Sequence, residues 1–433
     1  MRPFGVVRPH SAQRGKIYMG VLAAVIPAAV AVGGCQVSAA GAGRGNPASG
    51  HTSAPYASGA PKATGGPTGG PRSAKERAAA AAATGEGTAQ GAKPPPCPPV
   101  PGQPTGGSPR IMIVGDSITS GSSGDYTWQY RLYQHLRADG VSPQMVGPHD
   151  WLYNNVTRAD GDCSYADPRF ERANDAHWGM ALWEEETAIR AKVATYRPDY
   201  LLALLGLDDL FWFLKTQSQM ASYLAGFIDQ ARAASPHIRI VLGIIPPDIH
   251  TQDSTTFAAS IGAFNNTIAA TASQLSTTAS PIAVAQDAAG FNVAADTWDG
   301  THPNANGEVK IAAGFANTLA RRFGLGTPYP TPFPVLPTGP LTQPRLTASA
   351  GGNAGSAVLS WTLAPGASGY YVFLKDVTAG GTAFKRLPFP LTPTQSPWTA
   401  GLLTSGHTYD FRLQACKGND CGAYSNVAPV TAP

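Results

Sequence analysis

The sequence predicts an α/β/α sandwich with a central parallel sheet, followed by a smaller all-β sandwich. Between residues 109 and 325, short apolar runs alternate with longer segments of helical periodicity, as expected for strands that helices cover on both faces. In residues 341–433 the pattern changes to short, partly alternating segments between Gly and Pro turns, which is typical of antiparallel sandwiches. Residues 326–340, "GTPYPTPFPVLPTGP", separate the two patterns as a linker because proline ends helices and central strands.

The chain begins with the pattern of an export signal, which we assign to residues 1–35. Four basic residues precede the mostly apolar run from Ile17 to Val32, and Gly33-Gly34-Cys35 follows it. The stretch "VGGC" is similar to a bacterial lipobox, which makes Cys35 a candidate lipidation site; a plain secretory signal and an uncleaved anchor are the alternatives. We therefore expect an extracellular or cell-surface protein that meets a membrane only through this segment or a lipid anchor.

Residues 36–108 are almost entirely Ala, Gly, Pro, Ser and Thr, and they end in "KPPPCPPVPG" and a short glycine-containing stretch. Such a segment buries too little apolar area to offset its chain entropy, so we expect a disordered, partly polyproline spacer. It would hold the folded regions away from the cell surface.

The elements of the two folded regions follow from these patterns. In the first region, the expected strands lie at 110–114, 143–147, 199–206, 238–245 and 281–286, and the expected helices at 127–138, 181–196, 220–234, 257–275 and 306–323. In the second, the expected strands lie at 356–362, 369–376, 408–418 and 421–430.

Charge and cysteine content exclude some classes of function. Only 13% of the 433 residues are charged and the net charge is +4, so we expect no nucleic-acid partner. No His/Cys cluster has the spacing of a metal site, and an even number of cysteines in an exported chain favours disulfides. Cys416 and Cys421 are close enough to close a hairpin. By elimination Cys97 would pair with Cys163, although spacing alone does not fix this connectivity.

Two motifs supply the groups of a nucleophilic serine site. Gly115-Asp116-Ser117 follows the first buried strand directly, and "DGTHP" at 299–303 precedes the last helix. A nucleophilic serine needs an imidazole to take its proton and a carboxylate to orient that imidazole. In a parallel sheet, reactive groups collect at the carboxyl ends of the strands, where Ser117 is expected.

With these motifs the chain resembles the GDSL-type, or SGNH, hydrolases over residues 109–325. Their four blocks carry, in order, a Ser, a Gly, an Asn and a His. Ser117 matches the first block and His302 the last. "HWGMAL" offers Gly179 for the second block, and "GLDD" at 206–209 takes the place of the third.

The resemblance implies a role for each matched residue and no metal or organic cofactor. Ser117 would be the nucleophile, His302 the general base and then acid, and Asp299 the orienting carboxylate. Asp296 is an alternative acid whose spacing from His302 fits the family less well. The oxyanion hole would consist of the backbone N–H groups of Ser117 and Gly179 together with the third-block side chain.

Asp208 departs from the family pattern, which has Asn at this position. An amide donates a hydrogen bond to a developing oxyanion, whereas an ionised carboxylate repels it. We expect either that burial and the adjacent Asp209 keep Asp208 protonated, or that another group supplies the donor. The hypothesis is a working esterase that is slow or favours acidic pH.

Several aromatic residues flank the blocks. They could form a wall for a sugar or acyl group, and they could equally belong to the packed core. They are Tyr126, Trp128, Trp178, Phe211 and Trp212.

The C-terminal region resembles a fibronectin type III domain over residues 341–433. Trp361 takes the place of the core tryptophan, and Tyr409 that of the tyrosine corner. Such a module beside a catalytic domain is common in secreted polysaccharide-active enzymes, so the resemblance implies contact with a polysaccharide or the cell wall.

The expected function is therefore an exported serine esterase. Its first-region sequence looks most like secreted carbohydrate esterases, which implies an acetyl or other short-chain ester on a carbohydrate. The alternatives are a lipase or arylesterase of the same family, and a non-catalytic surface protein that binds acylated glycan. An α/β-hydrolase is excluded because Ser117 is followed by Ile118-Thr119 and not by the expected x-Gly.

Overall fold

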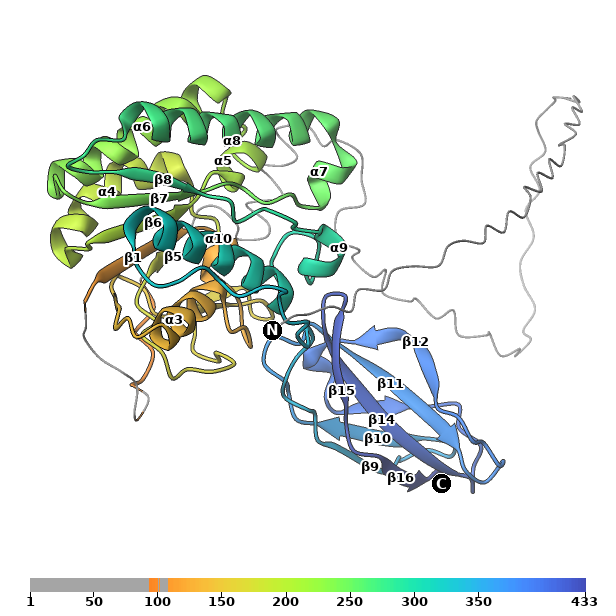
Figure 1. The fold of residues 1–433 in the computed structure, drawn as a ribbon. Helices are drawn as coiled ribbons and strands as arrows, with labels where there is room; N and C mark the ends of the chain where they lie inside the picture. Colours follow the sequence, from red (N-terminus) through yellow and green to blue (C-terminus); the bar gives the residue numbers. More distant parts are fainter. Residues whose placement is uncertain (1–92, 100, 102–107) are drawn as a thin grey trace, which may run out of the picture. The chain divides into compact units, whose positions relative to one another are not determined.

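The computed structural model describes residues 93–99, 101 and 108–433, and Figure 1 shows its fold. The expected signal segment, Cys35 and most of the expected spacer lie outside the described residues. All described residues belong to one unit of the chain, 64–433. None of their helices is both long enough and apolar enough to cross a membrane.

A parallel sheet forms the centre of the first folded region. Its strands are β1 (Arg110–Gly115), β2 (Gln144–Met145), β5 (Asp175–Ala176), β6 (Tyr200–Leu204), β7 (Arg239–Gly243) and β8 (Ile282–Ala285). The order is β2-β1-β6-β7-β8, β5 pairs with the end of β1, and every pairing is parallel. The longer strands are buried almost throughout because helices cover both faces.

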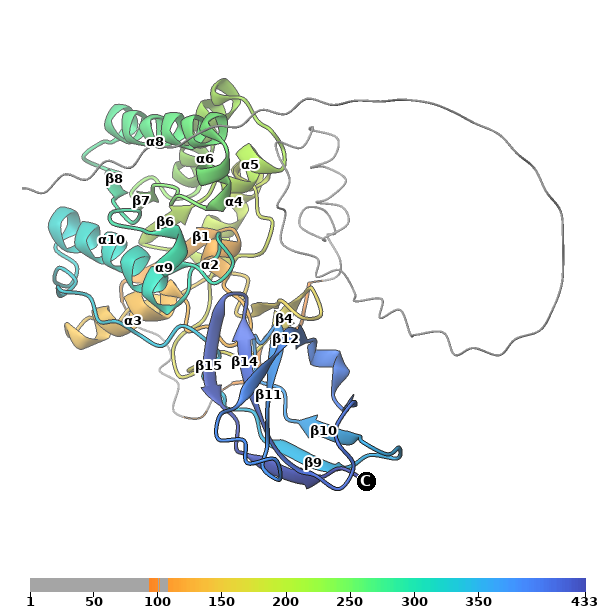
Figure 2. The same cartoon turned by 90° about the vertical axis from the view of Figure 1, so that its right-hand side faces the viewer.

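Two layers of helices enclose this sheet (Figures 1 and 2). One face carries α4 (Leu182–Tyr196), α6 (Gln217–Ala234) and α8 (Thr255–Leu275), and the other carries α3 (Trp128–Ala138) and α10 (Ala305–Phe323). The predicted α/β/α fold class is thereby confirmed.

Short helices follow the carboxyl ends of the strands. They are α2 (Ser117–Ser120) after β1, α5 (Leu207–Phe211) after β6, α7 (Ile249–Asp253) after β7 and α9 (Val293–Asp296) after β8. This edge is where parallel α/β sheets present their functional groups.

The C-terminal region contains two antiparallel sheets. One has the order β13-β10-β9, from β9 (Leu346–Ala350), β10 (Ala357–Trp361) and β13 (Trp398–Ala400). The other contains β11 (Gly369–Asp376), β12 (Lys385–Leu391), β14 (Thr408–Lys417), β15 (Asp420–Tyr424) and β16 (Ala428–Thr431). Trp361 packs beside Tyr370 in their shared core. No helix or strand lies between Phe323 and Leu346, so the expected linker is irregular.

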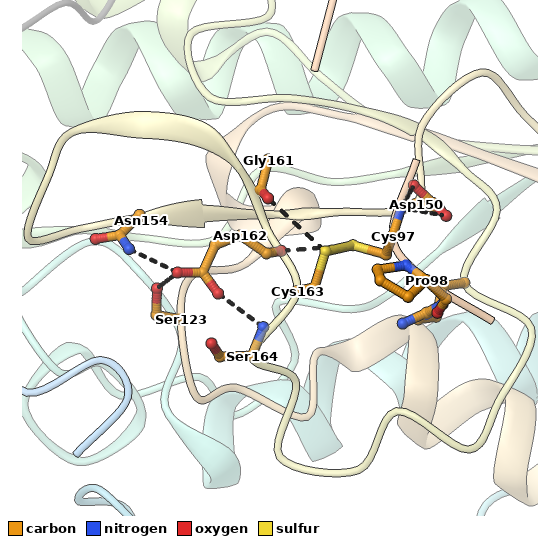
Figure 3. The surroundings of a disulfide bond; sticks show 10 residues. Cys97, Pro98, Ser123, Asp150, Asn154, Gly161, Asp162, Cys163 and Ser164 are labelled. Carbon is orange, nitrogen blue, oxygen red and sulfur yellow. Dashed lines mark hydrogen bonds between the residues drawn. A yellow bond between two sulfur atoms is a disulfide. The ribbon is translucent and has the colours of Figure 1, made fainter. Parts of the chain in front are cut away.

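The structure contains two disulfide bonds, Cys97–Cys163 and Cys416–Cys421. Figure 3 shows the first, where the Cys97 N–H also donates to the Asp150 carboxylate at 3.1 Å. Cys97 is buried. The expectation of a disordered spacer up to residue 108 is therefore wrong for residues 93–99, which the disulfide and these hydrogen bonds hold against the first region.

A β-hairpin that the sequence did not predict lies next to this disulfide. It consists of β3 (Leu152–Asn154) and β4 (Ala159–Asp162). The Asp162 carboxylate accepts hydrogen bonds from Ser123 Oγ at 2.8 Å and Asn154 Nδ2 at 2.6 Å (Figure 3). It thereby joins the hairpin to the loop that follows α2.

Candidate active site

Ser117 lies at the carboxyl edge of the sheet, at the first position of α2. The preceding Asp116 caps this short helix, because its carboxylate accepts a hydrogen bond from the Ile118 N–H at 3.0 Å. The cap stops β1 and turns the chain within two residues. The Ser117 hydroxyl is thereby held at the rim of the sheet, with 7% of the residue exposed.

His302 and Asp299 lie in the loop between α9 and α10. His302 Nδ1 is 2.7 Å from Asp299 Oδ2, while Asp299 Oδ1 accepts the backbone N–H groups of Thr301 and His302 at 3.0 and 2.9 Å. The side chains are 12% exposed for His302 and 29% for Asp299. This geometry holds the imidazole with Nδ1 toward the carboxylate, the orientation that a serine triad requires.

The turn between Asp299 and His302 depends on a glycine. Gly300 has a φ of +102°, which side-chain-bearing residues rarely adopt, and a Cβ there would lie 2.8 Å from the Ile249 Cβ. The Gly300 carbonyl also accepts the Ile249 N–H at 2.7 Å. The loop is thus packed tightly against α7.

Ser117 and His302 line the same cavity, which connects the two motifs in space. Asp125 and Trp178 are also among its lining residues, and its volume is about 10 Å³. That is roughly the room that one water molecule needs. Ser117 and His302 are therefore brought together around a small void, whereas Gly179, Asp208 and Asp299 are not among its lining residues.

Aromatic rings stack beside the imidazole. The Trp178 ring lies 4.2 Å from the His302 ring at an interplanar angle of 16°, and Tyr153 stacks on Trp178 at 4.0 Å. Trp298 is also nearly parallel to His302, at 5.3 Å. The indole N–H of Trp178 donates to the Gly121 carbonyl at 2.9 Å, which fixes its plane. Because Trp178 and Trp298 both pack nearly parallel to the His302 ring, they limit the side-chain rotamers open to His302.

The expected second-block and third-block residues follow strands that flank β1. In the sheet register, Gly115 lies opposite both Ala176 of β5 and Leu204 of β6. Gly179 follows β5 after a short turn and has a φ of +78°. Asp208 is the second residue of α5 and is buried. The parallel topology therefore brings all four blocks to one edge of the sheet.

Asp209 has a structural task that the sequence did not indicate. Its carboxylate accepts the backbone N–H groups of Leu182 at 2.7 Å and Trp183 at 3.1 Å, at the beginning of α4. Burial raises the pKa of Asp209 to about 6, although these hydrogen bonds oppose the rise. Asp209 is thus directed toward a helix N-terminus.

Two further buried carboxyls lie near His302, and the sequence does not point to either of them as a site residue. Burial raises the pKa of Asp116 to about 7, opposed by the Ile118 N–H and by the charge of His302. Burial likewise raises the pKa of Asp248, which caps α7, to about 6. Their place directly before Ser117 and Ile249 gave a capping signal but none for proximity to His302.

Asp299 shows the opposite shift. Although burial acts to raise the pKa of Asp299, the charge and hydrogen bonds of His302 hold it below its usual value. The carboxylate beside the imidazole therefore stays ionised at neutral pH, as a partner for a charged histidine requires.

Asp296, the alternative acid, has a different partner. Its carboxylate forms an ion pair with Lys310 of α10 at 2.6 Å and is buried. The structure thus places Asp299, and not Asp296, in contact with the His302 ring.

Among the five flanking aromatic residues, Trp178 stacks on the His302 ring. Trp128 is fully buried and stacks on Phe315 in the core, and it also lines the cavity with Ser117. Phe211 stacks on His250, Trp212 packs on Phe211, and Tyr126 packs on Tyr130. Tyr153 and Trp298, which do lie in the stack with Trp178 and His302, were not singled out. Trp298 directly precedes Asp299, which was the one available signal.

A parallel α/β/α fold that brings a serine, a histidine and an aspartate to one edge of its sheet is an arrangement that serine hydrolases use. Among the described residues, no three His, Cys, Asp or Glu side chains are arranged to hold a metal ion. Residues 113–309 match the model of the GDSL-like lipase/acylhydrolase family. They form a GDSL-like lipase/acylhydrolase domain, which supports an SGNH-type ester hydrolase.

Solved structures similar to this chain include several esterases. A family 3 carbohydrate esterase from Talaromyces cellulolyticus is 25% identical, with 49% of this chain and 96% of that chain covered and a TM-score of 0.42. A family 3 carbohydrate esterase from Clostridium thermocellum is 23% identical, with 48% and 94% covered and a TM-score of 0.40. An acetyl esterase variant with acetate ion is 24% identical, with 49% and 96% covered and a TM-score of 0.42. No curated protein matches the chain.

Proposed function

We propose that the protein hydrolyses carboxylic esters through an acyl-enzyme on Ser117. The observation that carries the proposal is the 2.7 Å contact between His302 Nδ1 and Asp299 Oδ2, in a loop that shares a cavity with Ser117. His302 accepts the Ser117 proton as Oγ attacks the ester carbonyl, and then donates it to the departing alcohol. Water next attacks the acyl-enzyme, again with His302 as base, and the carboxylic acid leaves.

The oxyanion of each tetrahedral intermediate needs hydrogen-bond donors. We assign the backbone N–H groups of Ser117 and Gly179 to this task, together with the side chain of Asp208. The Asp208 side chain is buried, and the next residue in the sequence is the buried Asp209. Because a carboxyl group donates only when it is protonated, we expect Asp208 to act as a neutral acid and turnover to be slow or to favour acidic pH.

The proposal for Asp208 is tested with Asp208→Asn. An amide donates at every pH, so the variant should raise turnover of p-nitrophenyl acetate at pH 8 or broaden the range of active pH; one oxyanion donor is typically worth about 100- to 1000-fold in rate. The pH profile of kcat is measured for both forms. Lower turnover in the variant across pH 4 to 9 would exclude a donating role for Asp208.

For substrate, we propose an acetyl or other short-chain ester on a carbohydrate. Residues 113–309 match a family of lipases and acylhydrolases, and the partly exposed Trp178 beside His302 gives an incoming sugar an aromatic edge to contact. A lipase or arylesterase is the alternative. Turnover is compared on p-nitrophenyl acetate, p-nitrophenyl octanoate and acetylated xylan. A preference for the octanoate with no acetate release from xylan would contradict the carbohydrate assignment.

We further propose that the protein is exported, with Cys35 as the lipidation site, and that residues 341–433 are a fibronectin type III domain. Two disulfides favour an oxidising compartment. The Tyr409 hydroxyl accepts the Thr404 N–H at 3.0 Å, as a tyrosine corner does. Metabolic labelling with a palmitate analogue, lost in Cys35→Ser, tests the anchor. Labelling that persists in this variant would exclude Cys35.

A second candidate is a glycan-binding protein that has lost turnover, and Asp208 is the observation that favours it. A fluorophosphonate probe separates the two candidates because it reacts only with an activated serine. Labelling of the intact chain that is abolished in Ser117→Ala and falls in His302→Ala supports the esterase. The absence of labelling from pH 4 to 9 supports the binding protein.

A further inference from the structure

The turn between β14 and β15 contacts the loop that carries His302. This turn, Lys417–Asp420, is closed by the Cys416–Cys421 disulfide, and we call it the hairpin tip. The Asn419 N–H donates to the Trp298 carbonyl at 2.8 Å. Asp420 accepts a hydrogen bond from Asn304 Nδ2 at 3.0 Å. The tip thus binds the His302 loop on both sides of the histidine.

Lys417 also contacts the loop that follows Ser117. Its Nζ forms an ion pair with Asp125 at 2.6 Å and donates to the Ser123 carbonyl at 3.0 Å, and its side chain is only 5% exposed. Asp125 lines the cavity with Ser117 and accepts the Ser122 N–H at 2.8 Å. The Lys417 ammonium is 5.2 Å from the centre of the Trp298 ring. One buried cation therefore touches both active-site loops.

Gly418 permits this close approach. It has a φ of +52°, and a Cβ built on it would lie 2.1 Å from the Trp298 carbonyl oxygen. That atom belongs to backbone, so a side chain at 418 would have to displace the tip or the loop. Trp298 in turn lies parallel to His302 and its N–H donates to the His302 carbonyl at 3.1 Å. Gly418 therefore lies against the residue that packs beside the imidazole.

We propose that the hairpin tip is a positioning element of the active site and that Lys417 is its principal positioning residue. Lys417 fixes the separation of the Ser117 loop from the His302 loop, although neither it nor its domain touches the reacting atoms. The C-terminal sandwich is then part of the catalytic apparatus. This inference rests on the proposed esterase function.

The physical reason is the sensitivity of proton transfer to geometry. Ser117 and His302 come from loops that are far apart in sequence, and displacing a reacting group by about 1 Å costs roughly 100-fold in rate. A buried ion pair also leaves an uncompensated charge when one partner is removed, so Asp125 would reorient toward water without Lys417. Substrate affinity depends less on this alignment than turnover does.

The experiment compares matched pairs of variants in the full chain. Gly418→Ala is paired with Gly380→Ala, because Gly380 also has a positive φ, +74°, but a Cβ there meets nothing within 4 Å. Lys417→Met is paired with Lys375→Met, which breaks an ion pair with Asp410 elsewhere in the sandwich. We expect kcat on p-nitrophenyl acetate to fall about 10- to 100-fold in the tip variants with KM changed less than threefold, and both controls to stay within twofold of the parent.

Amide hydrogen exchange gives a readout that does not need turnover. Peptides covering Trp298 and His302 should exchange faster in Lys417→Met and Gly418→Ala than in the controls at temperatures well below unfolding. Unchanged kcat and unchanged exchange in both tip variants would overturn the proposal. If the parent chain neither hydrolyses esters nor reacts with fluorophosphonate, the proposed function fails, while the exchange comparison still decides whether the tip orders the His302 loop.

Discussion

Asp116 shows how a single buried carboxyl can link the site to stability. It lies directly before Ser117, caps α2 and is 2% exposed. Burial raises its pKa from 3.8 to about 7, with the charge of Asp209 acting in the same direction and His302 opposing it. A carboxyl with a raised pKa favours the folded state only while protonated. Its contribution is complete below its unfolded pKa and is lost as the pH rises through about 7.

Asp116→Asn should therefore reduce the loss of stability between pH 5 and pH 8. The amide oxygen can still accept the Ile118 N–H, so the cap is kept while the titrating proton is removed. We expect the difference in free energy of unfolding between the two pH values to shrink by a few kcal/mol, because each pKa unit corresponds to about 1.4 kcal/mol. Urea unfolding at both pH values measures it.

The matched control is Asp253→Asn, because Asp253 is exposed. This variant should leave the difference in free energy of unfolding between pH 5 and pH 8 unchanged. Asp209 and Asp248 have pKa values raised by burial in the same sense and remain in both variants, so some loss with rising pH persists. An Asp116→Asn variant with the parent's full pH dependence would contradict the assignment of the shift to Asp116.

At the scale of single residues, the contacts that could be predicted from the sequence are those between residues a few positions apart. The contact between Asp299 and His302 spans three residues of one loop, so it is visible in the order of the letters. The stack of Tyr153, Trp178 and His302 joins residues about 25 and 124 positions apart, which no local pattern records. Lys417 is 294 residues from Ser123. Its role depends entirely on tertiary contact.

The helices and strands differ in how well they can be predicted from the sequence. The buried strands β1, β6, β7 and β8 and the five long helices have the strong apolar periodicity that predicts them. The strand expected at 143–147 shrinks to Gln144–Met145, and β5 has two residues. The β3–β4 hairpin contains "ADGD", whose pairing comes from the contacts around Asp162. The short helices α7 and α9 are each about one turn, too short for a periodic signal.

The two disulfides should differ in their effect on stability because they close loops of different length. Cys97 and Cys163 are separated by 66 residues, and Cys416 and Cys421 by 5. In the chain-entropy model, removing the first costs about 4 kcal/mol and the second about 2 kcal/mol. Cys97→Ser/Cys163→Ser should therefore lower the Tm more than Cys416→Ser/Cys421→Ser. Calorimetry of both double variants measures the difference, and equal or reversed losses would contradict a loop-length origin.

At the scale of the whole molecule, each of the two folds can be predicted separately from its own sequence, but the C-terminal region contacts loops of the first region. The sequence divides cleanly at residues 326–340, and each region has its own hydrophobic core. Composition and periodicity describe each core by itself, because they depend on local apolar patterns. The contacts of Lys417 and Gly418 with the loops that carry Ser117 and His302 are single side-chain and backbone contacts without any repeating pattern. These contacts are consequently the part of the architecture that cannot be predicted from the sequence.

The Cys97–Cys163 bond changes what a protease can release from this protein. Ser117 lies between the two cysteines along the chain, so a peptide-bond cut anywhere from 98 to 162 opens a ring and leaves both fragments in one molecule. Everything that precedes Cys97, including Cys35, would stay attached to the catalytic domain after such a nick. Under the proposed anchoring at Cys35, release of the domain after such a nick would require a further cut before Cys97 or a reductant.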